Sequence, residues 1–156
     1  MQVPSRGPVR LRRRRAADDG FIAQLGDEAF AEYDPRAAQT TLRLAHAGTT
    51  WVASRDNQLL GFAVVQVHRD HAELCAIAVA PGARGSGVGT QLVREVVRAL
   101  ELSGVARLTL HTAQANLSGL DLFLKLGFRV NARIPRFYRG MFEACAMSKT
   151  LNAAPR

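Results

Sequence analysis

The 156-residue sequence contains only two cysteines, Cys75 and Cys145, and it has no run of about 20 uninterrupted apolar residues. Both cysteines lie in apolar, strand-like segments without CxxC spacing or a nearby histidine pair, so we expect no disulfide framework, no zinc site and no other metal centre. The missing apolar span, together with the missing apolar stretch at the N-terminus, predicts a soluble cytoplasmic protein without membrane contact.

Acidic residues are also few: 13 Asp and Glu stand against 21 Lys and Arg, which gives a net charge of +8. The densest basic cluster is Arg10 with Arg12 to Arg15. This excess suggests nucleic-acid binding, but no helix-turn-helix, aromatic stacking motif or regular basic helix face accompanies it, and the arginines alternate like the outer edge of a first strand. Nucleic acid is therefore a disfavoured partner. A basic surface also attracts a polyphosphate cofactor or an acidic protein.

The chain reads as one domain without repeats or internal linkers. Residues 1–8, with two prolines and a glycine, predict a flexible lead-in, and residues 9–152 predict a single domain of a size that folds without metal or disulfide. A helix is expected after a cap at Asp18 or Asp19, ending at Asp34-Pro35. The other elements expected from apolar periodicity are strands at 9–15, 49–55, 58–68, 72–79, 107–112, 128–133 and 144–151, and helices at 35–47, 88–102 and 117–126.

The most informative segment is the glycine loop Arg84-Gly85-Ser86-Gly87-Val88-Gly89, which joins an apolar strand to a helix. Its glycines remove side chains where the backbone bends sharply and approaches a ligand. The helix that follows directs unpaired N–H groups and the positive end of its dipole at the same place. The loop therefore predicts a phosphate-binding site.

Spacing separates three kinds of phosphate loop. A Walker A loop ends in Gly-Lys-Ser/Thr, whereas here Gly89 is followed by Thr90-Gln91. A dinucleotide-binding loop needs a carboxylate at the end of the next strand to hold the ribose, but that strand ends in His111-Thr112. Neither of these two loops fits the sequence.

The third pattern, Arg/Gln-x-x-Gly-x-Gly/Ala, is matched by Arg84 to Gly89, which resembles the acetyl-CoA pyrophosphate loop of the GNAT acetyltransferase superfamily. Downstream, Asn116, Leu122-Phe123 and Gly127-Phe128 are similar to that family's Asn-x-x-Ala-x-x-Leu-Tyr-x-x-x-Gly-Phe segment. The resemblance extends over roughly residues 9–151. It implies an α+β fold of three layers: a mixed, mostly antiparallel central sheet, helices on both faces, and two neighbouring strands splayed to form an acetyl-CoA cleft.

The resemblance also implies how acetyl-CoA is held as a co-substrate. Backbone groups of Ile77, Ala78 and Val79 would bind the pantetheine arm and the thioester, with one N–H as an oxyanion donor, and the loop N–H groups would bind the pyrophosphate. The donor-binding residues implied in this way are Ile77, Ala78, Val79, Arg84, Gly85, Ser86, Gly87, Val88, Gly89, Thr90, Asn116 and Phe123.

Two side chains fall where the family places a catalytic base. Glu73 lies eleven residues before the loop arginine, and it shares a pleat face with Cys75, Ile77 and Val79 if no bulge intervenes. His111 lies five residues before the asparagine, the position of a catalytic glutamate or histidine in acetyltransferases that act on protein N-termini. Imidazole is slightly favoured because its ordinary pKa lies near neutrality, but the choice stays open, and across the splayed strands the two could share one water.

The proton for the departing thiolate is a separate question. Phe123 occupies the position of the family's tyrosine acid and has no proton to give, so the thiolate leaves unassisted, through water, or with help from Tyr138. The segment Arg136-Phe137-Tyr138, followed by Glu143-Ala144-x-x-Met147, is similar to the stretch with which N-terminal amino-group (ribosomal-protein alanine) acetyltransferases clamp a peptide. A wall for the substrate is the favoured role for Tyr138.

These residues predict an N-acetyltransferase in which a primary amine attacks the thioester of acetyl-CoA directly. The acceptor is a protein N-terminus or a small amine, approached through the loops 31–41 and 134–142. The alternative is a non-catalytic acyl-CoA-binding or regulatory module that lost its acid at Phe123. The identity of the amine and the oligomeric state, a homodimer included, stay open.

Overall fold

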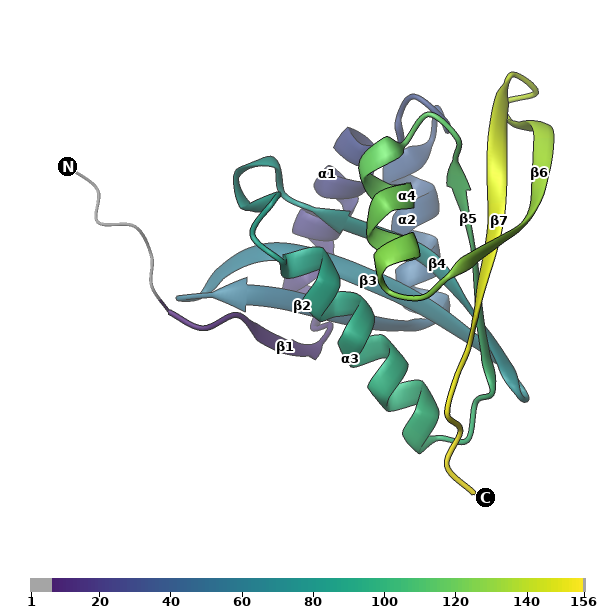
Figure 1. Ribbon diagram of the computed structural model, residues 1–156. Helices are drawn as coiled ribbons and strands as arrows, with labels where there is room; N and C mark the ends of the chain where they lie inside the picture. The colour runs from purple at the N-terminus through teal and green to yellow at the C-terminus, as the bar shows by residue number, and fades with distance from the viewer. Residues whose placement is uncertain (1–6, 156) are drawn as a thin grey trace.

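A seven-stranded sheet with the order β1-β2-β3-β4-β5-β7-β6 forms the centre of the computed structural model, which describes residues 7–155. Helices α1 and α2 cover one face of the sheet, and α3 and α4 cover the other (Figure 1). The expected three-layer α+β fold is confirmed, while the lead-in expected for residues 1–8 lies mostly outside the described residues. The elements are β1 (Arg10–Arg13), η1 (Ala16–Asp18), α1 (Asp19–Phe30), α2 (Ala37–Ala47), β2 (Thr49–Arg55), β3 (Gln58–His68), β4 (His71–Val79), η2 (Pro81–Ala83), α3 (Val88–Leu102), β5 (Arg107–Ala113), α4 (Leu117–Lys125), β6 (Arg129–Tyr138) and β7 (Phe142–Thr150).

β2, β3 and β4 form an antiparallel meander, and β1 pairs antiparallel with the other edge of β2. The β2–β3 turn places Asp56 and Asn57 at φ values of 49° and 63°. A two-residue hairpin turn of type I′ has positive φ at both central positions, and Asn and Asp tolerate this conformation better than most residues do. This turn sets the register in which β2 and β3 present their apolar side chains to the core.

The basic cluster at the N-terminus is held within the molecule. β1 is an edge strand, as expected, and the Arg12 guanidinium donates two hydrogen bonds to the Asp18 carboxylate, at 2.7 and 3.0 Å. Arg13 lies over the Trp51 ring at 4.5 Å, and Arg14 pairs with Asp19 at 2.8 Å. Asp18 is the N-cap residue of α1, one of the two positions expected, but its side chain makes no capping hydrogen bond, and its carboxylate accepts from Arg12 and the Arg15 N–H instead.

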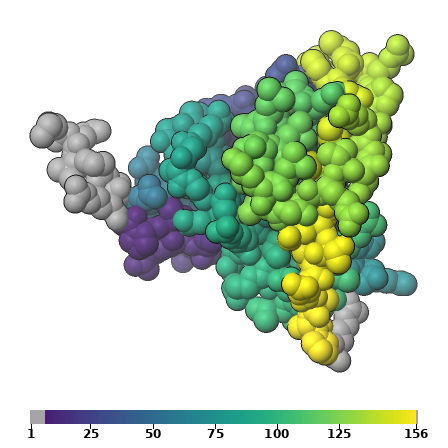
Figure 2. Space-filling view, in the orientation of Figure 1, coloured from purple at the N-terminus to yellow at the C-terminus, as the bar shows by residue number. Residues whose placement is uncertain are grey.

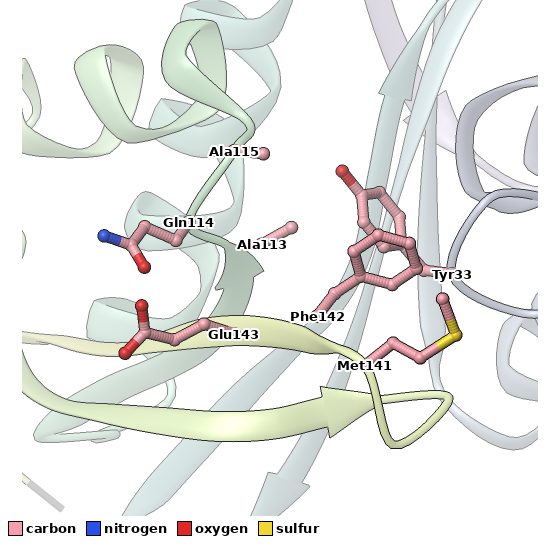
Figure 3. Close-up of a pocket in the computed structure, with 7 residues that line it drawn as sticks. All are labelled: Tyr33, Ala113, Gln114, Ala115, Met141, Phe142 and Glu143. Atoms are coloured by element: carbon pink, nitrogen blue, oxygen red, sulfur yellow. The ribbon is translucent and has the colours of Figure 1, made fainter.

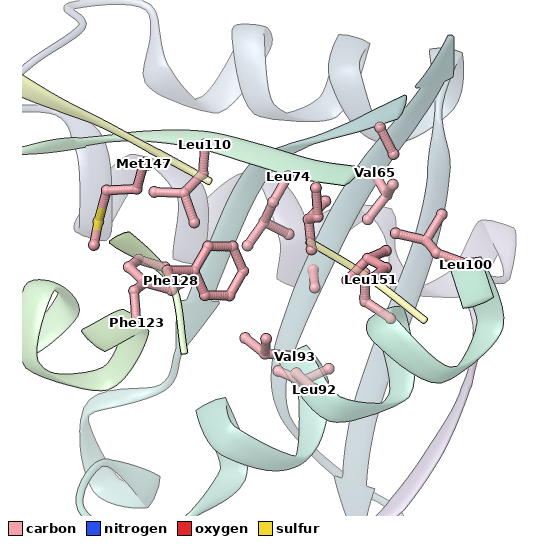
Figure 4. Packing of buried hydrophobic residues seen from close by; sticks show 14 of the residues in the cluster. Val65, Leu74, Leu92, Val93, Leu100, Leu110, Phe123, Phe128, Met147 and Leu151 are labelled. Atoms are coloured by element: carbon pink, nitrogen blue, oxygen red, sulfur yellow. The ribbon is translucent and has the colours of Figure 1, made fainter. Parts of the chain in front are cut away.

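Two apolar clusters hold the layers together. The larger one packs α3 and α4 on the sheet, and the α3 side chains Leu92, Val93, Val96 and Leu100 are at most 6% exposed, as their helical spacing predicted (Figure 4). The smaller cluster packs α1 and α2 on the opposite face, around Phe62. Since both faces of the central strands are buried, β3 reads in the sequence as a nearly continuous apolar run.

The sheet splits between β4 and β5. The two strands pair in parallel only from His71 to Leu74 and from Arg107 to Leu110, although both continue further, to Val79 and Ala113. A bulge begins the split: Val64 pairs with Ala76 and Val65 pairs with Leu74, so that Cys75 has no partner in β3. The bulge bends β4 away from β5 and opens a gap between their ends.

The bulge also changes which way the β4 side chains face. Leu74, Ile77 and Val79 pack with the α3 side of the core, whereas Cys75 and Ala76 pack with the α1 side. Glu73 therefore lies on the opposite face from Ile77 and Val79: a shared face was expected only if no bulge intervened, and a bulge is present. The reason is the extra residue, which shifts the two-residue alternation by one.

β6 is longer than predicted and forms the other edge of the sheet. All but two of its residues are exposed, and its pairing with β7 is irregular between Val130 and Ala132 and between Ile134 and Tyr138. Figure 2 shows the α4 segment and the β6–β7 ribbon together covering one side of the molecule. Within residues 7–155, none of the helices has the length and apolar character needed to cross a membrane.

Candidate active site

The glycine loop lies exposed at the N-terminus of α3. Gly85 and Gly87 have φ values of 74° and 88°, and Gly87 is the N-cap residue of the helix. A Cβ built at either position would meet no atom within 4 Å, so these glycines are required by their backbone conformation and not by crowding from the protein. The space beside the loop is open to a ligand.

Side chains of the loop brace it against the protein. The Arg84 Nε donates to the Val79 carbonyl oxygen at 3.0 Å, and the Ser86 hydroxyl donates to the Ala83 carbonyl. The first intrahelical bond of α3 runs from the Gln91 N–H to the Gly87 carbonyl, at 3.0 Å. The N–H groups of the preceding turn therefore have no acceptor inside the helix and can bind an anion such as a pyrophosphate.

Gly89 has a different reason to be glycine. A Cβ there would approach the Leu122 Cδ2 at 3.3 Å, so its absence lets the first turn of α3 lie close to α4. Asn116 is the N-cap residue of α4. Its Oδ1 accepts from the Gly119 N–H at 3.2 Å, and its Nδ2 donates to the Thr112 Oγ1 at 3.3 Å. These contacts fix the position of α4 beside the loop.

The predicted donor-binding residues divide into two groups in the structure. Ile77, Ala78 and Val79 form the end of β4 that diverges from β5, and this strand leads through η2 directly into the loop. In contrast, Phe123 is 4% exposed and packs edge-on against Phe128, with ring centroids 5.5 Å apart. Its side chain belongs to the core beneath the split.

Glu73 and His111 lie on one face of the sheet. Glu73 pairs with Thr109, two residues before His111, and all three face away from the α3-side core that buries Leu74 and Leu110. The His111 ring is exposed and stacks on Phe137, with centroids 4.8 Å apart and planes inclined by 13°. The sheet thus brings both predicted bases to the side of α1 and α2, at the point where β4 and β5 begin to separate.

A row of aromatic rings continues from His111 across this face. The ring centroids lie 4.8 Å apart for Phe137 and Tyr138, 5.1 Å apart for Tyr138 and Tyr33, and 5.3 Å apart for Tyr33 and Phe142. We call these five residues the aromatic row. Burial raises the pKa of Tyr138 to about 12, and burial also raises the pKa of Tyr33, so both phenols keep their protons at neutral pH.

The aromatic row borders an open pocket of about 290 Å³. Figure 3 shows Gln114 and Glu143 on one side of it and the rings of Tyr33 and Phe142 on the other. The Gln114 N–H donates to the Glu143 carbonyl at 2.9 Å, which ties β5 to β7 at the pocket wall. The pocket thus combines apolar rings with one acidic residue, Glu143, at its edge, a combination that suits an amine on an apolar stem. Its lining residues are Tyr33, Ala113, Gln114, Ala115, Met141, Phe142 and Glu143.

Tyr33 is one of the pocket-lining residues that the sequence did not single out. It follows α1, outside any motif, and it reaches the site through contacts with residues more than a hundred positions away in the chain. The only available signal was its position inside the 31–41 segment, which we expected to face the acceptor.

The two cysteines are free thiols, Cys75 half-buried and Cys145 buried. The Cys75 thiol lies beside the split and donates to the Glu73 carbonyl at 3.5 Å. Burial, reinforced by the Glu73 charge, raises the pKa of Cys75 to about 11. Because the thiolate is the reactive form, this cysteine is a poor nucleophile at neutral pH. Among residues 7–155 no three His, Cys, Asp or Glu side chains are grouped so as to hold a metal ion.

The sheet that splits between β4 and β5 leads into a glycine loop at a helix N-terminus, with a pocket beside the split, and these features define an α/β fold with the geometry of an anion-binding site. The sequence matches the acetyltransferase (GNAT) family over residues 15–128, and the chain belongs to this family.

Named relatives and solved structures agree with this assignment. The chain is 36% identical over 83 residues to a [ribosomal protein bS18]-alanine N-acetyltransferase of Salmonella typhimurium, covering 53% of this chain and 55% of that protein. It is 30% identical over 124 residues to a mycothiol acetyltransferase of Corynebacterium efficiens, covering 74% of this chain and 42% of that one. The chain thus spans about half the length of these relatives.

A GNAT family acetyltransferase from Elizabethkingia anophelis, solved with acetyl-CoA bound, has the same fold. Its TM-score is 0.78 at 19% identity, over 92% of this chain and 98% of the other. The expected fold class is thereby confirmed by comparison as well as by topology.

Proposed function

We propose that this protein transfers an acetyl group from acetyl-CoA to a primary amine by direct attack of the amine on the thioester. The observation that carries the proposal is the divergence of β4 from β5 immediately before an exposed glycine loop, with a separate pocket beside the split. Membership of the GNAT family and the acetyl-CoA bound in the Elizabethkingia anophelis structure support the choice of donor.

The backbone provides most of the donor site in this proposal. The N–H groups from Arg84 to Thr90 bind the pyrophosphate, and Ile77, Ala78 and Val79 hold the pantetheine arm as an added strand, with one N–H directed at the thioester oxygen. When bound, acetyl-CoA supplies an acetyl group on a thiol leaving group. Asn116 acts by positioning α4, and Phe123 by filling the core under the split.

Glu73 and His111 are the proposed bases for the incoming amine. They lie on the same face as the aromatic row, so a proton can leave the amine through water shared by the two side chains. An α-amino group, with an ordinary pKa near ~8, needs less help to lose its proton than a lysine near ~10.4. A site with one exposed imidazole and one partly exposed carboxylate is suited to the easier task.

The proton for the CoA thiolate comes from Tyr138 or from water in this scheme. Tyr138 keeps its proton at neutral pH, since burial raises its pKa to about 12, but its ring contacts with Phe137 and Tyr33 favour a role as a wall for the substrate. A covalent acetyl-cysteine intermediate is disfavoured because the Cys75 thiol is also held in its protonated form.

The acceptor that we propose first is a protein N-terminus, and a small amine second. One relative is named for an alanine of ribosomal protein bS18, and the other is named for mycothiol. The aromatic row and the open pocket are long enough together to contact an amine and the residues that follow it, which supports a peptide.

Release of free CoA thiol tests the proposal directly. Wild-type protein is assayed with acetyl-CoA and a panel of peptide N-termini and small amines, alongside the Glu73→Gln and His111→Ala variants. Loss of the base should lower kcat by roughly 10²–10⁴-fold. His68→Ala and Glu95→Gln, which change the same residue types on other parts of the surface, are the matched controls.

Two outcomes would contradict the proposal in different ways. No turnover with any amine, while CoA binding is intact, would show a non-catalytic acyl-CoA-binding module, consistent with the missing tyrosine at Phe123. Turnover that is unaffected in both variants would assign proton removal to another group or to bulk water.

A further inference from the structure

We propose that the acceptor is an acidic peptide: an N-terminal amine enters the pocket, and carboxylates on the following residues bind the arginines of β6 and the β6–β7 turn. The inference rests on the proposed acetyl transfer and specifies its acceptor. The residues that carry it are Arg129, Arg133, Arg136 and Arg139, called here the β6 arginines.

The β6 arginines lie in a stretch of the chain whose charged residues are all positive. From Arg129 to Phe142 the chain has four arginines and no aspartate or glutamate. All four are exposed, and none of them takes part in the ion pairs found among the described residues. The N-terminal arginines differ, because Arg12 and Arg14 are already paired with carboxylates. β6 and its turn therefore carry a continuous stretch of positive charge that is not neutralised by ion pairs within the described residues.

The same arginines begin at the pocket. Arg139 donates to the Glu32 carbonyl at 3.3 Å, which places it at the loop that carries Tyr33. Next to it, Tyr138 contacts Tyr33, one of the pocket-lining residues. Arg136 and Arg133 follow at intervals of three residues, about 10 Å along a strand. Because β6 is the outer strand of the sheet, arginines on either of its faces flank this edge, and a peptide that follows the edge from the pocket can meet them in turn.

The sign of the charge changes along this path. Glu143 is the charged residue among those that line the pocket, and its negative charge favours the positive amine of the acceptor. Beyond the pocket the charged residues of β6 itself are all arginines, which favour negative groups. An N-terminus followed by Asp or Glu residues has this order of charges, whereas a nucleic acid offers the phosphates without the amine.

A second copy of the chain fits this edge poorly. The pairing of β6 with β7 is interrupted at two places, Pro135 lies within β6, and Arg136 has a φ of 57°. Irregular backbone and repeated like charges are features that prevent edge-to-edge pairing of strands. Recognition through the arginine side chains is therefore favoured over addition of a strand.

The test uses three peptides that share an N-terminal alanine and differ only at positions 2–6, which carry acidic, neutral amide or basic side chains. The measured quantity is kcat/KM for release of CoA. We expect the acidic peptide to exceed the neutral one by roughly tenfold at low salt, and this ratio to fall towards one as salt screens the exposed charges. A ratio of one or less at low salt would overturn the inference.

Charge reversal locates the effect. Arg136→Glu should bring the ratio of acidic to neutral peptide down to about one or below it. Arg107→Glu makes the same change on an exposed arginine at the start of β5, the strand whose other end lines the pocket, and it should keep the wild-type ratio. An unchanged ratio in Arg136→Glu would exclude the β6 arginines. If that variant does not fold, the salt dependence of the wild-type ratio decides.

Failure of the proposed function is visible separately. If no peptide releases CoA, acetyl transfer to peptides is wrong, and fluorescence anisotropy of the same peptides, labelled at their C-termini, still measures recognition. Tighter binding of the acidic peptide than of the neutral one, weakened in Arg136→Glu, would then support the surface alone. Equal binding of all three peptides, or tighter binding of a single-stranded oligonucleotide, would overturn it.

Discussion

Replacement of Gly87 by alanine separates the stability of the loop from its ability to bind the donor. Gly87 is the N-cap of α3 at a φ of 88°, and a Cβ there would meet nothing within 4 Å. The change in stability therefore comes from the backbone conformation alone. An L-residue forced into left-handed conformation costs about 1–2 kcal/mol, so Gly87→Ala should lower the free energy of unfolding by this amount in the absence of ligand.

Donor binding should decrease by more than stability does. The proposed site uses N–H groups beside Gly87, and hydrogen bonds to charged groups contribute about 1.5–3 kcal/mol each. Loss of one such bond, through a methyl group in the path of the phosphate or through a relaxed loop, raises Kd for CoA by roughly 10–150-fold. Isothermal titration calorimetry with CoA measures the Kd, and urea unfolding of the free protein measures the change in the free energy of unfolding.

Gly82→Ala is the matched control, because this glycine lies in η2, has no positive φ, and would also place its Cβ in open space. Gly82→Ala should leave the Kd for CoA within about twofold of wild type. It should leave the free energy of unfolding unchanged or raise it slightly. A Kd for CoA that is unchanged in Gly87→Ala would refute the assignment of this loop to the pyrophosphate. A loss of stability far above 2 kcal/mol would show that the loop is more tightly packed than the structure indicates.

Two further predictions concern Asp18 and Tyr138. The hydrogen bonds from Arg12 hold the pKa of Asp18 below its ordinary value, so the ionised carboxylate stabilises the fold above pH ~4 and this stabilisation disappears as the pH falls through the lowered pKa. Asp18→Asn should therefore unfold about 2 kcal/mol more easily at pH 7, and the difference should shrink in urea titrations towards pH 3.5; a difference that is constant with pH would contradict the role of the ion pair. For Tyr138, Tyr138→Phe should keep kcat near wild type while Tyr138→Ala raises KM for the acceptor several-fold, and a hundredfold loss of kcat in the phenylalanine variant would instead identify the phenol as the acid.

Local sequence signals were sufficient for the elements that depend on neighbouring residues. The turn at Asp56-Asn57, the apolar stripe of α3 and the glycines at its N-terminus each encode a conformation within a few positions. Those elements lie where the sequence predicted them, and the donor side of the candidate site was predicted through them.

The acceptor side depends on contacts between distant segments, and such contacts have no local pattern in the sequence. Tyr33 joins Tyr138 and Phe142 only after α1, β6 and β7 have assembled. The end of β6 was missed because an exposed edge strand has no buried face, so its sequence shows no two-residue apolar pattern. Asp18 has the position of a cap, but a cap and an ion pair look alike in sequence, and the Arg12 contact decides between them.

The extra residue at Cys75 gives β4 two halves with opposite parity. Before it, odd-numbered positions such as Glu73 face the α1 side, where we propose that the acceptor binds; after it, odd-numbered positions such as Ile77 and Val79 face the α3 layer. Deletion of this one residue would restore a single two-residue alternation along β4. The side chains of one half of the strand would then switch to the opposite face of the sheet, so residues of one proposed binding site would face the other. Within each half, by contrast, substitutions can alter the surface towards one substrate without presenting new side chains to the other.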